Sequence, residues 1–181
     1  MKGLTSAIHW TPTNFLENLQ NAPEIITNQR RIMLTRSMTL ITTNVVQTIT
    51  EGNEQGRKAI DRGLLRQSIS PGNVNTATGI IDEHRAAVGS RLFYADYLDK
   101  GTRPHWPPRQ PIQEWVWRHK AAFNITKESE AKGIAFVIAR KISKVGTKGY
   151  QFLAGGLKKS SEQLTVMAKE TAEAIVGEFF K

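Results

Sequence analysis

The stretch from Val88 to Thr102 constrains the fold most, because the spacing of its apolar side chains changes halfway along. Alternate residues up to Tyr94 fall on one face of an extended strand, since side chains in a strand alternate with period two; these residues are Val88, Ser90, Leu92 and Tyr94. The following residues are spaced for a single helical turn, which Gly101 ends as a C-terminal cap. We therefore expect the rest of the chain to pack around a strand that leads into one capped turn.

The length of 181 residues favours one domain, because domains commonly hold about 100–200 residues. We expect that domain to span 24–181. Residues 1–23 are interpreted as an N-terminal arm or peripheral segment, since Thr11-Pro12 and Ala22-Pro23 interrupt its pattern. The composition is that of an ordinary soluble protein, and the absence of cysteine excludes disulfides and cysteine-based metal sites.

The N-terminal half predicts one long helix followed by short strands. Apolar residues form a stripe at helical spacing over 24–51, namely Leu34, Met38, Ile41, Val45 and Ile49. Many threonines on the same stretch are weak helix formers, so packing must hold the helix. Leu64 and Leu65 begin a short helical turn or strand, and 74–93 reads as an antiparallel meander.

The C-terminal half predicts helices separated by a proline-rich arm at 103–111. Helices are expected at 112–122, 127–145 and 157–180, with Gly155-Gly156 as a hinge before the last one. The apolar face of the 127–145 helix is assigned to Ile134, Val137, Ile138 and Ile142. The fold class is therefore α+β, with a small antiparallel β-sheet packed against a long N-terminal helix and C-terminal helices.

The net charge of +9 is concentrated in the second half of the chain. Residues 1–90 carry a net charge of +2, whereas residues 91–181 carry +7. A basic half is compatible with nucleic acid and at least as well with a solvated basic surface or a face matched to an acidic partner, and these interpretations stay open. No signal peptide and no apolar run of about 18 residues is evident, so we expect no membrane partner.

The titratable residues form no pattern that catalysis requires. The four histidines lack neighbouring acids in a triad arrangement, and His105 and His119 are too isolated for a zinc pair. Asp96 and Asp99 fall on the single helical turn and are interpreted as surface or capping residues. We expect no enzyme activity, no catalytic residue, no metal and no cofactor.

The aromatic residues divide into core and interface candidates. Tyr94, Tyr97, Trp115 and Phe136 fall on apolar faces and are expected in the core. Trp106 has no periodic partner, so it is either an anchor for a protein partner or packs back on its own domain. The candidate protein-interface residues are Arg66, Arg103, His105, Trp106 and Arg109.

Three ordered strings carry a resemblance over about residues 57–155. They are D-x-G-x-L-R-x-S-I from Asp61, V-G-S-x-x-x-Y-A-x-Y-L-D-x-G-T from Val88, and I-A-R-x-I-x-x-x-G-T-x-G-Y-x-F-L from Ile138. The set resembles the tail-completion proteins of long-tailed bacteriophages, also described as head–tail joining, neck or minor tail proteins. The arm after Thr102 with the helix around Trp115 is an insertion beyond the shortest members, and the first 23 residues match no part of the family.

The resemblance implies a small α+β structural protein of a phage or prophage virion, without known chemistry. Such proteins assemble as rings at the head–tail junction, typically six-fold, after a stage in the host cytoplasm. The implied partners are further copies of the chain, tail-tube proteins and head-connector proteins, with non-specific contact to passing DNA as an addition. Its motif residues are expected to be structural: Asp61, Gly63, Tyr94, Tyr97, Asp99, Gly101 and Thr102. The alternative function is a sequence-independent nucleic-acid-binding protein.

Overall fold

The computed structural model describes residues 12–53, 56, 59, 61–74 and 76–179. The chain forms two compact units. Unit 1 extends from the N-terminal region to Leu92 and resumes at Phe152, and unit 2 runs from Phe93 to Gln151. Unit 2 is therefore inserted into unit 1 in sequence.

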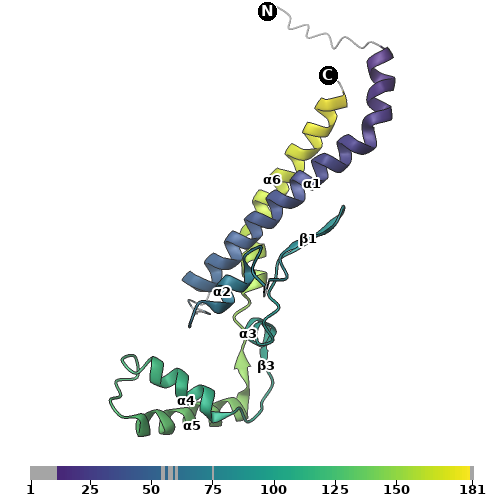
Figure 1. Ribbon diagram of the computed structural model, residues 1–181. Coiled ribbons are helices and arrows are strands. Elements are labelled where there is room, and N and C mark those ends of the chain that lie inside the picture. The colour runs from purple at the N-terminus through teal and green to yellow at the C-terminus, as the bar shows by residue number, and fades with distance from the viewer. Residues whose placement is uncertain (1–11, 54–55, 57–58, 60, 75, 180–181) are drawn as a thin grey trace, which may run out of the picture. The chain divides into compact units, whose positions relative to one another are not determined.

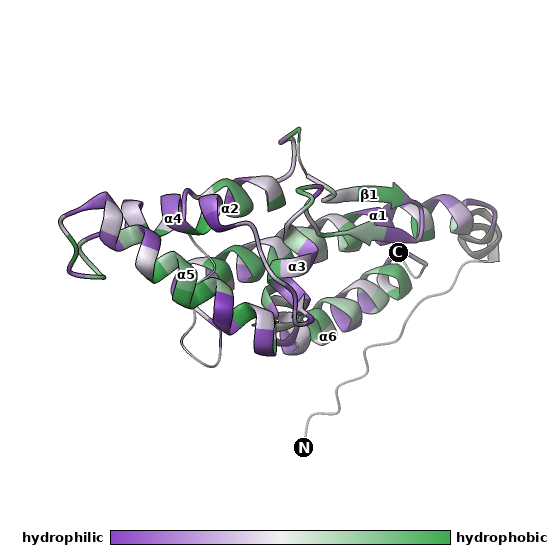
Figure 2. Cartoon of the chain, turned by 90° about the horizontal axis from the view of Figure 1, so that it is seen from below, coloured by the Kyte–Doolittle hydropathy of each residue, from purple (hydrophilic) through white to green (hydrophobic). Residues whose placement is uncertain are grey.

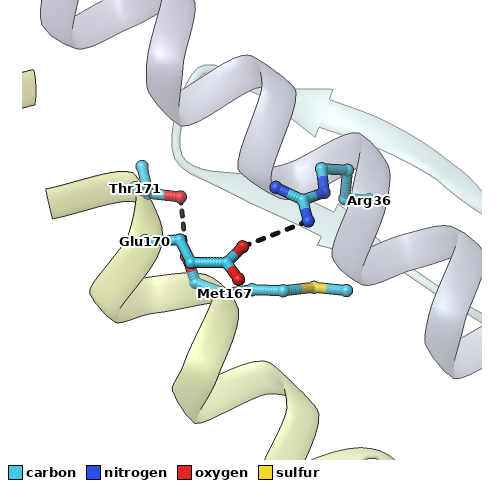
Figure 3. A network of polar contacts seen from close by, with 4 residues as sticks. All are labelled: Arg36, Met167, Glu170 and Thr171. Atoms are coloured by element: carbon cyan, nitrogen blue, oxygen red, sulfur yellow. Dashed lines mark hydrogen bonds and ion pairs between the residues drawn. The ribbon is translucent and has the colours of Figure 1, made fainter. Parts of the chain in front are cut away.

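Two long helices form the frame of unit 1. Helix α1 spans Pro12–Glu51 and helix α6 spans Phe152–Phe179, and the two lie side by side in antiparallel order (Figure 1). Polar contacts join them along their length: Gln29 Nε2 donates to Glu178 Oε1 at 2.7 Å, Arg36 Nη2 to Glu170 Oε2 at 3.2 Å, and Asn44 Nδ2 to Ser160 Oγ at 2.9 Å. Figure 3 shows the Arg36–Glu170 pair, which is half exposed and so contributes little to stability.

The core of unit 1 lies where α1 packs on α6 and on helix α2, Leu64–Ile69. The fully or almost fully buried apolar side chains of this unit are Val45, Ile49, Leu65, Ile69 and Phe152. Two glycines of α6 permit the approach, since a Cβ at Gly155 would lie 3.1 Å from the methyl group of Thr48. Burial of this cluster holds a helix whose threonines have low helix propensity.

A short hairpin packs against α1. Strands β1, Gly79–Asp82, and β2, Arg85–Ala87, pair antiparallel with an irregularity between Ile80 and Asp82. The turn is stabilised by Asp82, whose carboxylate accepts hydrogen bonds from the His84 N–H at 2.8 Å and Arg85 Nε at 2.7 Å. Both bonds hold the pKa of Asp82 below its usual range, with the Arg85 bond the larger cause.

Unit 2 is built from three helices and a two-stranded ladder. Its elements are α3, Ala95–Lys100; β3, Gly101–Thr102; α4, Arg109–Arg118; α5, Glu128–Val145; and β4, Thr147–Lys148. Helices α4 and α5 pack together, and the buried side chains there are Val116, Ala131, Ala135 and Ala139. The same two helices carry hydrophilic and hydrophobic residues in alternation (Figure 2).

The predicted α+β class is confirmed, and the apolar stripe of α1 is buried at Val45 and Ile49 and half-buried at Leu34, Met38 and Ile41, but several helix boundaries were wrong. Helix α1 begins at Pro12, because a proline is well accommodated in the first turn and Pro23 bends the helix without ending it. Helix α6 begins at Phe152, so Gly155-Gly156 lies inside a helix and is no hinge. Within the described part of 74–93, one hairpin and an isolated Thr76–Ser90 bridge replace the expected meander.

The N-terminal arm and the proline-rich arm were also placed differently. Residues 1–11 of the expected arm lie outside the described residues, and 12–23 belong to α1. The proline-rich arm gives way to α4 at Arg109, because Pro111 sits in the first helical turn, where no N–H is needed. A single domain over 24–181 stays a prediction.

Candidate functional site

Two Gly-Thr dipeptides meet in unit 2. Strands β3 and β4 pair antiparallel, with Gly101 opposite Lys148 and Thr102 opposite Thr147. The two threonine hydroxyls lie 2.9 Å apart, and the Thr147 N–H donates to Thr102 Oγ1 at 3.2 Å. The chain then runs back along α3, where the N–H groups of Tyr150 and Gln151 donate to the carbonyls of Leu98 and Asp99. We call Gly101–Thr102 with Gly146–Gly149 the glycine junction.

The glycine junction requires glycine for two reasons. Gly101 has φ 85° and ψ −175°, and Gly146 has φ 70° and ψ −160°, a region that residues with a Cβ essentially never adopt. Space is also absent, since a Cβ at Gly101 would lie 2.6 Å from the N atom of Gly149. The motif glycines therefore act by letting two backbones touch. The prediction that Gly101 caps α3 is confirmed by its N–H bond to the Tyr97 carbonyl.

A second pair of motif strings meets in unit 1. The hydroxyls of Ser68, on α2, and Ser90 lie 2.6 Å apart, and Ser68 is buried and also donates to the Leu65 carbonyl at 2.7 Å. Gly63 precedes α2 with φ 77°, which explains a glycine at that position. Asp61 is exposed. The first and second motif strings are thus joined by a hydrogen bond between side chains.

The predicted aromatic core was largely wrong. Tyr94 is half-buried at the start of α3 and not in a strand, while Tyr97, Trp115 and Phe136 are 59%, 37% and 43% exposed. The physical reason is that α5 turns an alanine seam toward α4, so the bulky Phe136 and Val137 stay outside. Periodicity found the helix, but it did not distinguish small inner residues from large outer ones.

The arm between β3 and α4 holds most of the candidate interface residues. Arg103, His105 and Trp106 are exposed, and Arg109 is the exposed first residue of α4. The Trp106 ring meets the Phe136 ring edge-on at 6.0 Å and remains 53% exposed, so it packs back in part and presents the remainder. Arg66 lies exposed on α2 in unit 1, so it is not part of the arm.

A groove of about 710 Å³ runs along the arm and α3, and two of the charged residues that line it form an ion pair. Lys100 Nζ lies 2.6 Å from Asp96 Oδ1, and that carboxylate raises the pKa of the Lys100 ammonium. The His105 ring bonds through Nδ1 to the Arg103 carbonyl at 2.9 Å. Of the groups that line the groove, the Thr102 hydroxyl is hydrogen-bonded to Thr147 Oγ1 at 2.9 Å and not to a general base.

The other described histidines are engaged structurally. His84 Nδ1 lies 2.7 Å from Arg30 Nη1, and His119 Nδ1 lies 2.9 Å from the Trp115 carbonyl. His9 lies outside the described residues. Within the part of the chain that the structure describes, no group of three or more His, Cys, Asp or Glu side chains is placed to hold a metal ion. The absence of enzyme activity stays a prediction.

Sequence reasoning missed the β3–β4 pairing, although the sequence carries a signal for it. Gly101-Thr102 and Gly146-Thr147 are the same dipeptide, and each directly follows a helix. Two identical chain reversals of this kind can pair as a short ladder. Thr102 and Thr147 are 45 residues apart, so no short-range sequence pattern indicated that the two dipeptides pair.

None of the known protein-family models matches the chain, and neither a curated protein nor a solved structure does. In the described segments, no helix combines the length and the apolar character that crossing a membrane requires.

Proposed function

We propose that the chain is a structural subunit of the head–tail junction of a long-tailed phage or prophage, a tail-completion, neck or tail-terminator protein that acts by ring assembly and docking. The observation that carries the proposal is the glycine junction. Two of the three strings behind the resemblance pair residue for residue there, and the remaining string bonds to the middle one through Ser68 and Ser90. A chance resemblance has to reproduce only the order of the three strings in the sequence. Here the strings also contact one another in the fold, which a chance resemblance does not require.

The surface also suits a protein that works by contact. Large apolar side chains are exposed on both units, including Ile81 of β1, Val176 of α6 and Phe93, and the arm adds Trp106. Aromatic side chains on a rigid backbone are common anchors in protein interfaces. Pro104, Pro107 and Pro108 restrict the arm, so little conformational entropy is lost when it docks.

A sequence-independent nucleic-acid-binding protein is the second candidate. Unit 2 carries eleven Lys and Arg against five Asp and Glu, a net charge of +6 with neutral histidines. Diffuse positive charge of this kind supports contact with phosphates and not base readout. The two candidates are compatible, because a ring at the junction surrounds the DNA that passes through it.

Electron microscopy of particles from a strain lacking the gene tests the proposal. We expect filled heads without tails, free tails or overlong tubes, and restoration of joined particles by the full-length chain supplied in trans. Supplying the chain with Lys169→Gln, an exposed side chain paired only loosely with Glu173 at 3.9 Å, serves as the matched control and should restore joining fully. Joined particles with tails of normal length in the deletion strain would overturn the proposal.

A further inference from the structure

The second half of α5 and the strand that follows it form a basic segment without acidic residues. Residues 131–151 contain no Asp or Glu but five basic residues, namely Lys132, Arg140, Lys141, Lys144 and Lys148. All five are exposed. The segment therefore supplies most of the positive charge excess of unit 2.

Three of these residues share the outer side of α5. Lys144 lies three residues after Lys141 and four after Arg140, so the three side chains are neighbours on the helix surface. They surround Val137, which is 66% exposed, and lie away from the alanine seam that packs on α4. We call Arg140, Lys141 and Lys144 the α5 cation cluster.

Interactions within the chain do not account for the cluster. No carboxylate among the described residues pairs with any of its three members. The helix dipole favours a cation in the last turn, which explains Lys144, but Arg140 and Lys141 lie before that turn. Like charges three and four residues apart destabilise a helix, so the cluster opposes folding and is suited to an anionic partner.

We propose that the α5 cation cluster binds the phosphate backbone of duplex DNA without reading its sequence. Arg and Lys side chains contact phosphate oxygens at any sequence, and helix α5 contains no Asn or Gln, the side chains that recognise adenine by paired hydrogen bonds. A duplex is favoured over a single strand because it carries twice the charge per unit length.

The inference deepens the proposed function and rests on it for the source of the duplex, the DNA that passes through the ring. The surface lies wholly within unit 2, so its assignment depends on no contact between the units. The binding can be measured on the purified chain without any phage component.

The test is fluorescence anisotropy of the full-length chain with a short duplex of mixed sequence, between ~50 mM and ~200 mM salt. The variant R140Q/K141Q/K144Q keeps unbranched polar side chains and similar helix propensity while removing three charges. Each lost phosphate contact reduces the magnitude of the slope of log affinity against log salt concentration by about 0.9. The slope of the variant should therefore be smaller in magnitude than the wild-type slope by about 2.7. The matched control R31Q/R62Q/R91Q removes three exposed charges from unit 1 and should keep the wild-type slope.

Circular dichroism and thermal unfolding establish that both variants fold. Equal loss of slope in both variants would overturn the inference, because binding would then follow net charge alone. Tighter binding of a single strand than of the duplex would also overturn it. If the chain shows no duplex binding at ~50 mM salt while the deletion strain still yields unjoined heads and tails, the inference fails and the proposed function stands. If the α5 variant loses binding while the deletion strain yields normal particles, the binding surface stands and the proposed function fails.

Discussion

A Cβ atom at Gly156 of α6 would lie 2.7 Å from the Cα atom of Val45 of α1. The obstacle includes the Val45 backbone as well as its Cγ2 methyl group, and Val45 is fully buried, so it has no room to move aside. The closest approach of the two long helices therefore depends on a glycine at this position.

Substituting Gly156 tests that dependence. Gly156→Ala should lower the free energy of unfolding by about 1–3 kcal/mol, the usual cost of overpacking a core. Gly177→Ala in the same helix meets no atom within 4 Å and should raise the free energy of unfolding by about 0.5–1 kcal/mol. Urea unfolding followed by circular dichroism measures both. Similar effects of the two substitutions would show that the helices do not approach at Gly156.

The hydrogen bond between Asn44 and Ser160 leads to a second prediction. Ser160 is fully buried and keeps a bond to the Gly156 carbonyl at 2.8 Å when Asn44 is removed. Asn44→Ala should therefore lower the free energy of unfolding by only about 0.5–1.5 kcal/mol. Gln47→Ala, which removes an exposed bond to Glu51, should change it by less than about 0.5 kcal/mol. A double-mutant cycle with Ser160→Ala measures the coupling, and a coupling of zero would contradict the bond.

The sequence predicted those parts of the fold that depend on local periodicity. The stripe from Leu34 to Ile49 identified α1, and Gly101 was identified as the cap of α3. The start of α1 could not be predicted, because a proline usually signals a break in a helix. Pro23 instead lies inside α1, which bends without ending. The start of α6, which holds Gly155 and Gly156, was missed for a similar reason, because the role of these glycines is set by α1, which is distant in sequence.

The sequence identified individual residues of the candidate site but not the contacts between distant segments that bring them together. The arm with Arg103, His105 and Trp106 was identified from its prolines and its unpaired aromatic residue. The pairing of Thr102 with Thr147 depends on two chain segments whose separation leaves no short-range signal. The exposure of Phe136 depends on which side of α5 the alanines occupy, and apolar spacing alone does not decide that.

The glycine junction supports a third prediction. Gly101→Ala introduces a residue into a backbone region that costs about 1–3 kcal/mol, and its Cβ collides with the backbone at Gly149. We expect the amide of Tyr150, which bonds to the Leu98 carbonyl at 2.8 Å, to lose hydrogen-exchange protection. Gly133→Ala in α5, where no atom lies within 4 Å, should leave that protection unchanged. Unchanged Tyr150 protection in Gly101→Ala would contradict the junction.

The start of α5 gives a prediction about pH. Glu130 Oε2 accepts hydrogen bonds from the N–H groups of Lys127 at 2.8 Å and Thr126 at 2.9 Å, and these bonds lower the pKa of the Glu130 carboxyl, the Lys127 bond most. A carboxyl with a lowered pKa stabilises the fold above its ordinary pKa of about 4.3, and that stabilisation is lost as the pH falls through the folded-state pKa. Glu130→Ala should therefore have a lower melting temperature than wild type at neutral pH. This difference in melting temperature, called the gap below, should disappear at acidic pH.

Thermal unfolding of both proteins between neutral and acidic pH measures the gap. Glu128→Ala is the matched control, since Glu128 lies in the same helical turn but its carboxylate accepts no bond from these two N–H groups. The difference in melting temperature between Glu128→Ala and wild type should be smaller, since it reflects an exposed bond from Gln113 Nε2 at 3.2 Å and the general attraction of a carboxylate to a helix N-terminus. A Glu130→Ala gap that persists unchanged in acid would contradict the role of the ionised carboxylate.

The exposed ring of Trp106 gives the prediction that bears most directly on docking. Trp106→Ala removes one edge contact to Phe136. Because the Trp106 side chain is already half exposed in the wild-type protein, the melting temperature should change little. Val166→Ala on α6 serves as the control, because Val166 has nearly the same exposure, 52% against 53%, and lies outside the arm. If the arm is the anchor, Trp106→Ala should reduce the yield of joined particles about tenfold or more when supplied to the deletion strain, since losing an anchoring aromatic residue commonly costs over 1 kcal/mol of binding. Equal yields from the two variants would place the docking contact elsewhere on the chain.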